Sequence, residues 1–349
     1  MTSIEDLLAS ILAATYGRDV RGAIHDAIEQ CYDDISTSKT IADDSAEAAS
    51  SAALQANSAA SRAETAADDV ERLWLAQNGI FPANNLMSLY YDEGSGFANV
   101  WAWIKNRIQN GNFTGIHVGD FIGVTCSNGF SFNARVAGIN TYKRSGSSSV
   151  PNHIDFISDV GWPTLIKMNP ANSNNGLTGR SVPFMASNAY YYLNSEAGNV
   201  PNSASDSSVS TAVDYTSDGV YYYLPSELKS VIVSKRVNAT GRFRSNEMVT
   251  SGTTSSSIQL GKLWLPFEPE VIGCSSIGNI RDAACGLMRY PLFVSWPNIS
   301  IGRESSDIYW LASAAEGNST GFVVVRRYGD LAIRNATEDS KVPICFRVA

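Results

Sequence analysis

The sequence is poor in the features that several function classes require. Its 349 residues contain 26 Lys and Arg against 34 Asp and Glu, for a net charge of -8, and no basic run that could neutralise phosphates. It has no apolar run long enough to cross a membrane, and its acidic start differs from the basic start of a signal peptide. We therefore expect no nucleic-acid partner, no membrane insertion and synthesis in the cytoplasm.

Cysteine and histidine are also scarce. The five Cys residues are widely spaced and odd in number, which predicts neither a disulfide framework nor a zinc site. His25, His117 and His153 are scattered, and none has metal spacing with a Cys or another His. We interpret Glu268 and Glu270, which flank a proline, as caps and solvated charges and not as an acid/base pair. The sequence thus predicts no catalytic residues, no metal and no cofactor.

What the chain does contain begins with two predicted amphipathic helices. Apolar residues at helical spacing run from Leu7 to Leu12, and Gly17 supplies a stop. The stripe of the second helix comprises Val20, Ile24, Ala27, Ile28, Cys31 and Ile35. Both helices are too small to stand alone, and we treat residues 1–38 as one N-terminal helical segment.

Residues 39–78 are rich in Ala, Ser, Asp and Glu and contain no Gly or Pro. Small residues recur there in alternating steps of three and four, which is the heptad pattern of a coiled coil. The seam predicted to mediate oligomerisation consists of Ala49, Ala52, Ala56, Ala59, Ala63, Ala66, Val70 and Leu73. We expect a parallel homotrimer with this segment as its stalk; a dimer and a single solvated helix are the alternatives.

The rest of the chain predicts an α+β globular domain. Residues 79–115 form a connector with a helix over 97–110, and Asn128-Gly129 predicts a hairpin with strands at 120–126 and 130–140. Further on we expect helices beginning at Ser187 and at Pro225-Ser226, and loops in the Ser-rich stretches 202–218 and 250–257.

The C-terminal end reads as strands. The segment GFVVVRRYGDLAIRN predicts two strands around a turn at Tyr328-Gly329-Asp330, and VPICFRVA predicts a final strand. We assign residues 116–349 to one globular domain.

An ordered series of phrases in this domain carries a family resemblance. GIHVGDFIGV, RVAGI, IDFISD, MNPANSNNG, YYLPSELKSVI, GKLWLPFEPEVIG, DIYWLASA and VPICFRVA together resemble a domain of unknown function found in phage tail proteins and Firmicutes surface proteins. That domain is similar to C-type lectins, to formylglycine-generating enzymes and to phage tropism determinants diversified by retroelements. The resemblance implies a C-type-lectin-like fold over about residues 85–349. The chain departs from it at Ala312, where relatives carry Arg, and in lacking the paired catalytic cysteines of the enzymes.

The segment Ala14–Asp34 resembles the opening of phage baseplate and tail-fibre proteins. Together the two resemblances imply a virion protein: residues 1–38 bind the tail or baseplate, the alanine-rich segment is a stalk, and the C-terminal domain binds a host-surface glycan or protein. The alternatives are an enzyme of the formylglycine-generating fold or a glycan depolymerase, and a purely structural tail fibre.

The predicted ligand-binding residues are polar, aromatic or cationic and alternate near the C-terminus with core residues such as Trp310 and Val323. Such side chains stack on sugar rings, bond hydroxyls or contact protein epitopes. The predicted set is Arg303, Ser305, Asp307, Tyr309, Asn318, Thr320, Phe322, Arg326, Tyr328, Arg334 and Asn335.

Overall fold

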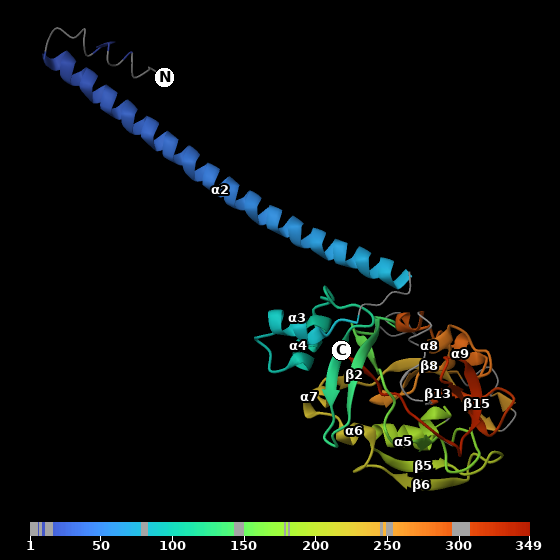
Figure 1. Cartoon of the computed structure of the whole chain (residues 1–349). Helices are drawn as coiled ribbons and strands as arrows, with labels where there is room; N and C mark the ends of the chain where they lie inside the picture. The colour runs from blue at the N-terminus through green and yellow to red at the C-terminus, as the bar shows by residue number, and fades with distance from the viewer. Residues whose placement is uncertain are drawn as a thin grey trace. The chain divides into compact units, whose positions relative to one another are not determined.

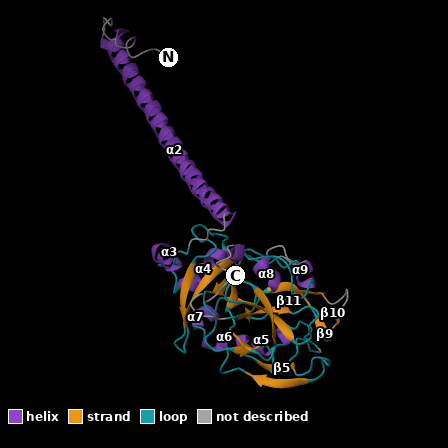
Figure 2. Ribbon diagram, turned by 45° about the vertical axis from the view of Figure 1, so that its right-hand side comes forward, coloured by secondary structure: helices purple, strands orange, loops and turns teal. Residues whose placement is uncertain are grey.

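The computed structural model of the chain describes residues 6, 9–10, 17–77, 83–142, 150–177, 179–180, 182–244, 247–248, 254–294 and 308–349. It divides into two compact units, Met1–Asp68 and Asp69–Ala349. A single long helix dominates the first unit, and all described strands belong to the second (Figure 1, Figure 2).

The long helix is α2, which spans Gly17–Gln77 without interruption. No Gly or Pro occurs from residue 23 to residue 77, and Ala, the strongest helix former, is the commonest residue there. At 61 residues the helix is about 90 Å long. The second predicted helix is therefore not short, because it continues through the alanine-rich segment; the helix predicted over 7–12 lies mostly outside the described residues.

The second unit contains strands and short helices. The strands are β1 Phe121–Thr125, β2 Ser131–Ile139, β3 Ile154–Ser158, β4 Ile166–Lys167, β5 Ala197–Pro201, β6 Ser210–Asp214, β7 Ile232–Val233, β8 Arg236–Thr240, β9 Arg242–Arg244, β10 Glu247–Met248, β11 Thr254–Gln259, β12 Leu263–Trp264, β13 Tyr309–Ala314, β14 Gly321–Val325, β15 Leu331–Asn335, β16 Asp339–Ser340 and β17 Cys345–Val348. The helices are α3 Leu86–Glu93, α4 Val100–Gln109, η1 Phe184–Ala186, α5 Asn188–Asn194, α6 Val220–Tyr223, α7 Ser226–Lys229, α8 Glu268–Ile272, α9 Arg281–Ala284 and η2 Pro291–Val294. This composition agrees with an α+β domain.

A six-stranded antiparallel sheet lies at the centre of this unit, in the order β1-β2-β3-β17-β12 with β7 also paired to β17. The last strand of the chain, β17, is internal: it pairs with β3 on one side and with β12 and β7 on the other. Phe346 of β17 stacks on Phe156 of β3 at 5.2 Å between ring centroids, and Trp101 of α4 meets both rings edge-on. The core of the domain therefore depends on its final residues.

Local signals located several elements correctly. Asn128-Gly129 lies in the turn between β1 and β2, where Gly129 adopts a φ of 86°. The predicted helix at 97–110 is α4, and Ser187 caps α5 by accepting a hydrogen bond from the Tyr190 amide at 3.1 Å. The Tyr328-Gly329-Asp330 turn joins β14 to β15, as predicted. Each of these features is fixed by neighbouring residues, which is why the sequence alone predicts it.

The Ser-rich loops were predicted wrongly. Residues 202–218 contain β6, which pairs with β5, and residues 250–257 overlap β11, which pairs with β8. Strand β6 is mostly exposed, so its sequence carries no alternation of apolar and polar residues. These strands form because a partner strand pairs with them, and not because their own sequences carry a strand pattern. Helix α3 also was not predicted.

The stack around Phe346 predicts a large stability effect. We expect Phe346→Ala to lower the free energy of unfolding by about 3–5 kcal/mol, because it removes a fully buried ring between two others. Urea unfolding followed by tryptophan fluorescence measures the change. The control is Tyr91→Ala, which truncates a ring that is 72% exposed and should change the free energy by less than about 0.5 kcal/mol.

Candidate binding surface

The predicted binding residues that the structure describes lie on or beside a three-stranded antiparallel sheet, β13-β14-β15. All residues of β13 and β14 are buried, whereas β15 is partly exposed. Tyr309 and Phe322, which were predicted to contact a ligand, are 2% and 0% exposed. That prediction is wrong for these two residues, because both side chains belong to the core and hold the sheet in place.

Six of the remaining predicted residues fall into two groups at opposite ends of the β14–β15 hairpin. Strand pairing runs from Gly321 opposite Asn335 to Val325 opposite Leu331. These ends are four residue steps apart, or about 13 Å. The loop patch, at the Gly321 end, comprises Asn318, Thr320, Arg334 and Asn335; the turn patch, at the other end, comprises Arg326 and Tyr328 together with Arg327 and Asp330. Arg303, Ser305 and Asp307 lie outside the described residues.

Hydrogen bonds inside the loop patch fix its polar side chains. The Asn318 carboxamide oxygen accepts from the Thr320 amide at 2.7 Å and from the Thr320 hydroxyl at 2.9 Å. That hydroxyl also lies 3.1 Å from the Asn335 carboxamide oxygen, which links the loop to β15. Arg334 and the Asn335 amide both bond Glu338, at 3.1 Å each. The patch is an ordered set of amide, hydroxyl and charged groups.

A buried carboxylate fixes the segment that pairs with the loop after β13. Glu268, fully buried at the start of α8, accepts four hydrogen bonds: from the amide and hydroxyl of Ser276 and from the amides of Ile277 and Gly278, at 2.6–3.1 Å. These bonds shape the segment 276–279. A Cβ at Gly278 would lie 2.4 Å from the carboxylate, so only glycine fits this turn.

The segment shaped by Glu268 pairs in turn with the chain that follows β13. The Asn279 amide bonds the Ala314 carbonyl and the Glu316 amide bonds the Ile277 carbonyl, both at 2.9 Å. From another direction, the buried Asn174 donates to the carbonyls of Asn318 and Gly321 at 2.6 Å. The loop after β13 is therefore tied down along its length, and its polar atoms are presented in one arrangement.

The turn patch presents an aromatic ring. Tyr328 is 73% exposed, and the Arg327 guanidinium lies 5.5 Å from its ring centroid. Arg326 forms an ion pair with Asp330 across the turn. Such an exposed pair contributes little to stability, so both groups are available to a ligand at small cost. An exposed ring beside ionic hydrogen-bonding groups is suited to stacking on a sugar or on a protein side chain.

The interior of the domain holds charged side chains that the sequence did not predict to be buried. Lys235 and Glu270 are both 0% exposed and form an ion pair, and the Tyr142 hydroxyl donates to the same carboxylate. The ammonium group also lies 4.8–5.1 Å from three ring centroids, those of Tyr142, Trp264 and Tyr290. The interpretation of Glu268 and Glu270 as solvated charges is therefore wrong; both are buried, although Glu270 does cap α8 by accepting from the Phe267 amide at 2.9 Å.

A neighbouring buried pair joins the two central strands. Arg347 of β17 donates to both carboxylate oxygens of Asp155 in β3 at 2.7 and 2.8 Å, and the Tyr290 hydroxyl adds a bond at 3.0 Å. Desolvation by burial raises the pKa of Asp155, but the charge and hydrogen bonds of Arg347 outweigh it and hold the pKa at about 2. The pair stays ionised at neutral pH.

Asp282 of α9 behaves in the opposite way. Its carboxylate is buried and accepts from the Ser313 hydroxyl of β13 at 2.8 Å, and Thr240 of β8 also hydrogen-bonds it. Desolvation outweighs these bonds and, with the charges of Glu268 and Glu270, raises the pKa of Asp282 to about 7. This carboxyl group therefore titrates near neutrality directly beside β13.

The cysteines are free thiols. Cys126, Cys285 and Cys345 are buried, while Cys31 and Cys274 are exposed. Cys285 contacts the Thr240 hydroxyl at 3.4 Å.

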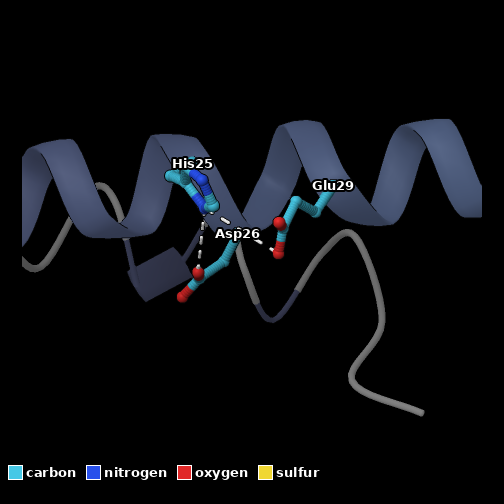
Figure 3. A group of neighbouring side chains, drawn as sticks. All are labelled: His25, Asp26 and Glu29. Atoms are coloured by element: carbon cyan, nitrogen blue, oxygen red, sulfur yellow. Dashed lines mark ion pairs between the residues drawn. The ribbon is translucent and has the colours of Figure 1, made fainter.

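Within the described residues, the one cluster with metal-ligand geometry is His25, Asp26 and Glu29 on α2 (Figure 3). The imidazole Nδ1 lies 3.7 Å from the Asp26 carboxylate and 3.8 Å from that of Glu29. All three side chains are exposed and nothing buried holds them in place, so we interpret them as a surface charge cluster. Over the same described residues, no helix is both long and apolar enough to cross a membrane.

Comparison with known proteins does not assign a family. None of the protein-family models, curated proteins or solved structures compared with the chain matches it.

Asp282 predicts a pH dependence of stability. Because its folded pKa lies above the unfolded value of 3.8, its protonation stabilises the fold fully at low pH, and this contribution is lost as the pH rises from about 4 through 7. Asp282→Asn keeps the group neutral. The free energy of unfolding of the variant, taken relative to that of the wild type, should increase by up to about 4 kcal/mol as the pH rises from 4 to 7.5.

Urea unfolding at a series of pH values measures this gain. The matched control is Asp339→Asn, which alters an exposed carboxylate of β16. A difference between the Asp282 variant and the wild type that stays constant over this range would contradict the raised pKa of Asp282.

Proposed function

We propose that the protein is a phage host-adhesion protein: a homotrimer of the virion whose N-terminal segment 1–38 attaches to the tail or baseplate. The alanine-rich part of α2 is its stalk, and the C-terminal domain binds a glycan or protein on the host surface. Support comes from the phage-tail-like phrases in both parts of the sequence and from the uninterrupted heptad-patterned helix. The C-type-lectin-like fold belongs to the same proposal, supported by the α+β architecture.

The observation that carries the binding role is the construction of the turn patch. Tyr328 is exposed, while β14 before it is buried throughout and pairs with β15 after it, so the ring is presented without the entropy cost of ordering a flexible loop. Charged groups of both signs flank it, as they do in sites that combine stacking with hydrogen bonds. A trimer would carry three such patches, and simultaneous contacts multiply weak single-site affinities.

Cell binding by point variants tests this proposal. We expect Tyr328→Ala in the full chain to reduce binding of fluorescently labelled protein to intact Firmicutes cells at least tenfold, and Arg326→Ala to reduce it less. Tyr91→Ala is the matched control, because its ring is 72% exposed against 73% for Tyr328 and lies on α3, outside the sheet. Flow cytometry over a protein titration measures the effect.

Equal binding by the Tyr328 and Tyr91 variants would contradict the assignment of the turn patch. Treating the cells with periodate or protease distinguishes a glycan ligand from a protein ligand, because periodate destroys glycans with vicinal hydroxyls and protease removes surface proteins. The fold of each variant is checked by near-ultraviolet circular dichroism.

A further inference from the structure

The apolar stripe near the start of α2 and the alanine seam follow one heptad register. Counting back from Ala42 in steps of four and three reaches Ser38, Ile35, Cys31, Ile28 and Ile24 in turn. No residue has to be skipped or inserted, and the helix is continuous across the junction. The two segments, which were predicted to have separate roles, form one unbroken seam along a single helix.

The beginning of this seam is apolar and lacks a covering partner among the described residues. Ile24, Ile28 and Ile35 are 43%, 52% and 66% exposed, and with Ala27, Cys31 and Tyr32 they line a shallow apolar hollow along one face of α2. Water-exposed isoleucines at seam positions are unfavourable in an isolated helix, whereas packing against a helix with the same pattern would bury them.

Most acidic residues of the helix lie away from the seam. With Ala42 at heptad position a, nine of the eleven acidic residues from residue 21 to residue 73 occupy the outer positions b, c and f. These are Asp26, Glu29, Asp33, Asp43, Asp44, Glu47, Glu64, Asp68 and Glu71. A solvated single helix has no reason to segregate its charges in this way, but a coiled coil does.

One charge pair also indicates the orientation of the partner. Asp34 falls at position g and Lys39 at the following position e, five residues later. In a parallel, in-register coiled coil the g residue of one helix meets this e residue of its neighbour, and here the two charges are opposite. An antiparallel partner would not bring them together.

We propose that Ile24–Ile35 is the clasp of a parallel, in-register homotrimer, and that its occupant is the same segment of two further copies of this chain. Isoleucine at positions a and d favours three strands over two, and this clasp has Ile28 and Ile35 at a and Ile24 at d. The inference rests on the homo-oligomer part of the proposed function. It deepens that function, because tail attachment then uses residues before Arg21 or the outer acidic face and not the apolar stripe.

The clasp explains how an alanine seam can hold an assembly together. Alanine buries little area, so the central seam contributes weakly for each residue. Large apolar residues stand at the two ends of the register, the isoleucines at one and Val70 with Leu73 at the other. The helix is thus anchored where the seam begins and where it ends.

Cys31, at a d position of the clasp, supplies a native probe. In the full chain with Cys274→Ser, diamide should oxidise two Cys31 thiols of one assembly to a disulfide, taking up their two electrons and two protons. In a trimer one thiol stays unpaired, so at completion two thirds of the chains should run as linked pairs on a non-reducing gel. In a parallel dimer all chains should pair, and an antiparallel arrangement should give no linked pairs.

A position scan controls for random collision of thiols. In the Cys31→Ser, Cys274→Ser background, Ser38→Cys restores a thiol at the next d position, whereas Thr40→Cys places one at the outer f position. We expect linked pairs from the first variant and at least tenfold fewer from the second. Equal yields, or none from Cys31 itself, would overturn the clasp.

Light scattering on a second pair of variants tests the energetics. Ile28→Asp should convert a particle of three chain masses into monomers, whereas Leu54→Asp should leave it intact, because Leu54 is 69% exposed but falls at position f. Near-ultraviolet circular dichroism confirms that the globular unit of each variant remains folded. An Ile28→Asp variant that stays trimeric would overturn the proposal and free the stripe for another partner. A trimer that fails to bind cells would instead count against the adhesion role alone.

Discussion

The ion pair between Lys235 and Glu270 constrains the whole globular unit, because neither charge reaches water. Removing one partner of such a pair typically costs about 3–5 kcal/mol, since the other charge is left buried and alone. The surrounding residues therefore have to supply what water would. Tyr142 and the Phe267 amide bond the carboxylate, and three aromatic rings enclose the ammonium. The elements that provide these groups cannot shift without exposing a charge to water or leaving it buried without its partner.

The second buried pair, Asp155 with Arg347, constrains the central sheet in the same way, and it also constrains the order in which the domain folds. Its partners are 192 residues apart, and β17, which carries Arg347, pairs with strands from three other parts of the chain. The sheet cannot be completed before the last residues of the chain are in place. Such dominance of long-range contacts is typical of slow-folding domains.

This long range also explains what the sequence could and could not predict. The Asn128-Gly129 hairpin, the Ser187 cap and the Tyr328-Gly329-Asp330 turn depend on neighbours, and all were located correctly. The burial of Glu270 depends on Lys235 and Tyr142, which are 35 and 128 residues away, so no local pattern distinguishes it from a surface charge. Tyr309 and Phe322 were misplaced for a related reason: alternation along a strand indicates one exposed face, whereas both faces of β14 are covered.

The buried charges and the surface loop belong to one construction. Glu268 is two residues from Glu270 on the same short helix, so the pair that fixes α8 in the core also fixes the carboxylate that shapes residues 276–279. That segment bonds the chain leaving β13, and Asn174 bonds the same loop from the other side. A polar loop held in this way can change its outward side chains without losing its backbone conformation. Rigid support from the interior is thus what would allow such a surface to vary in specificity while the fold stays the same.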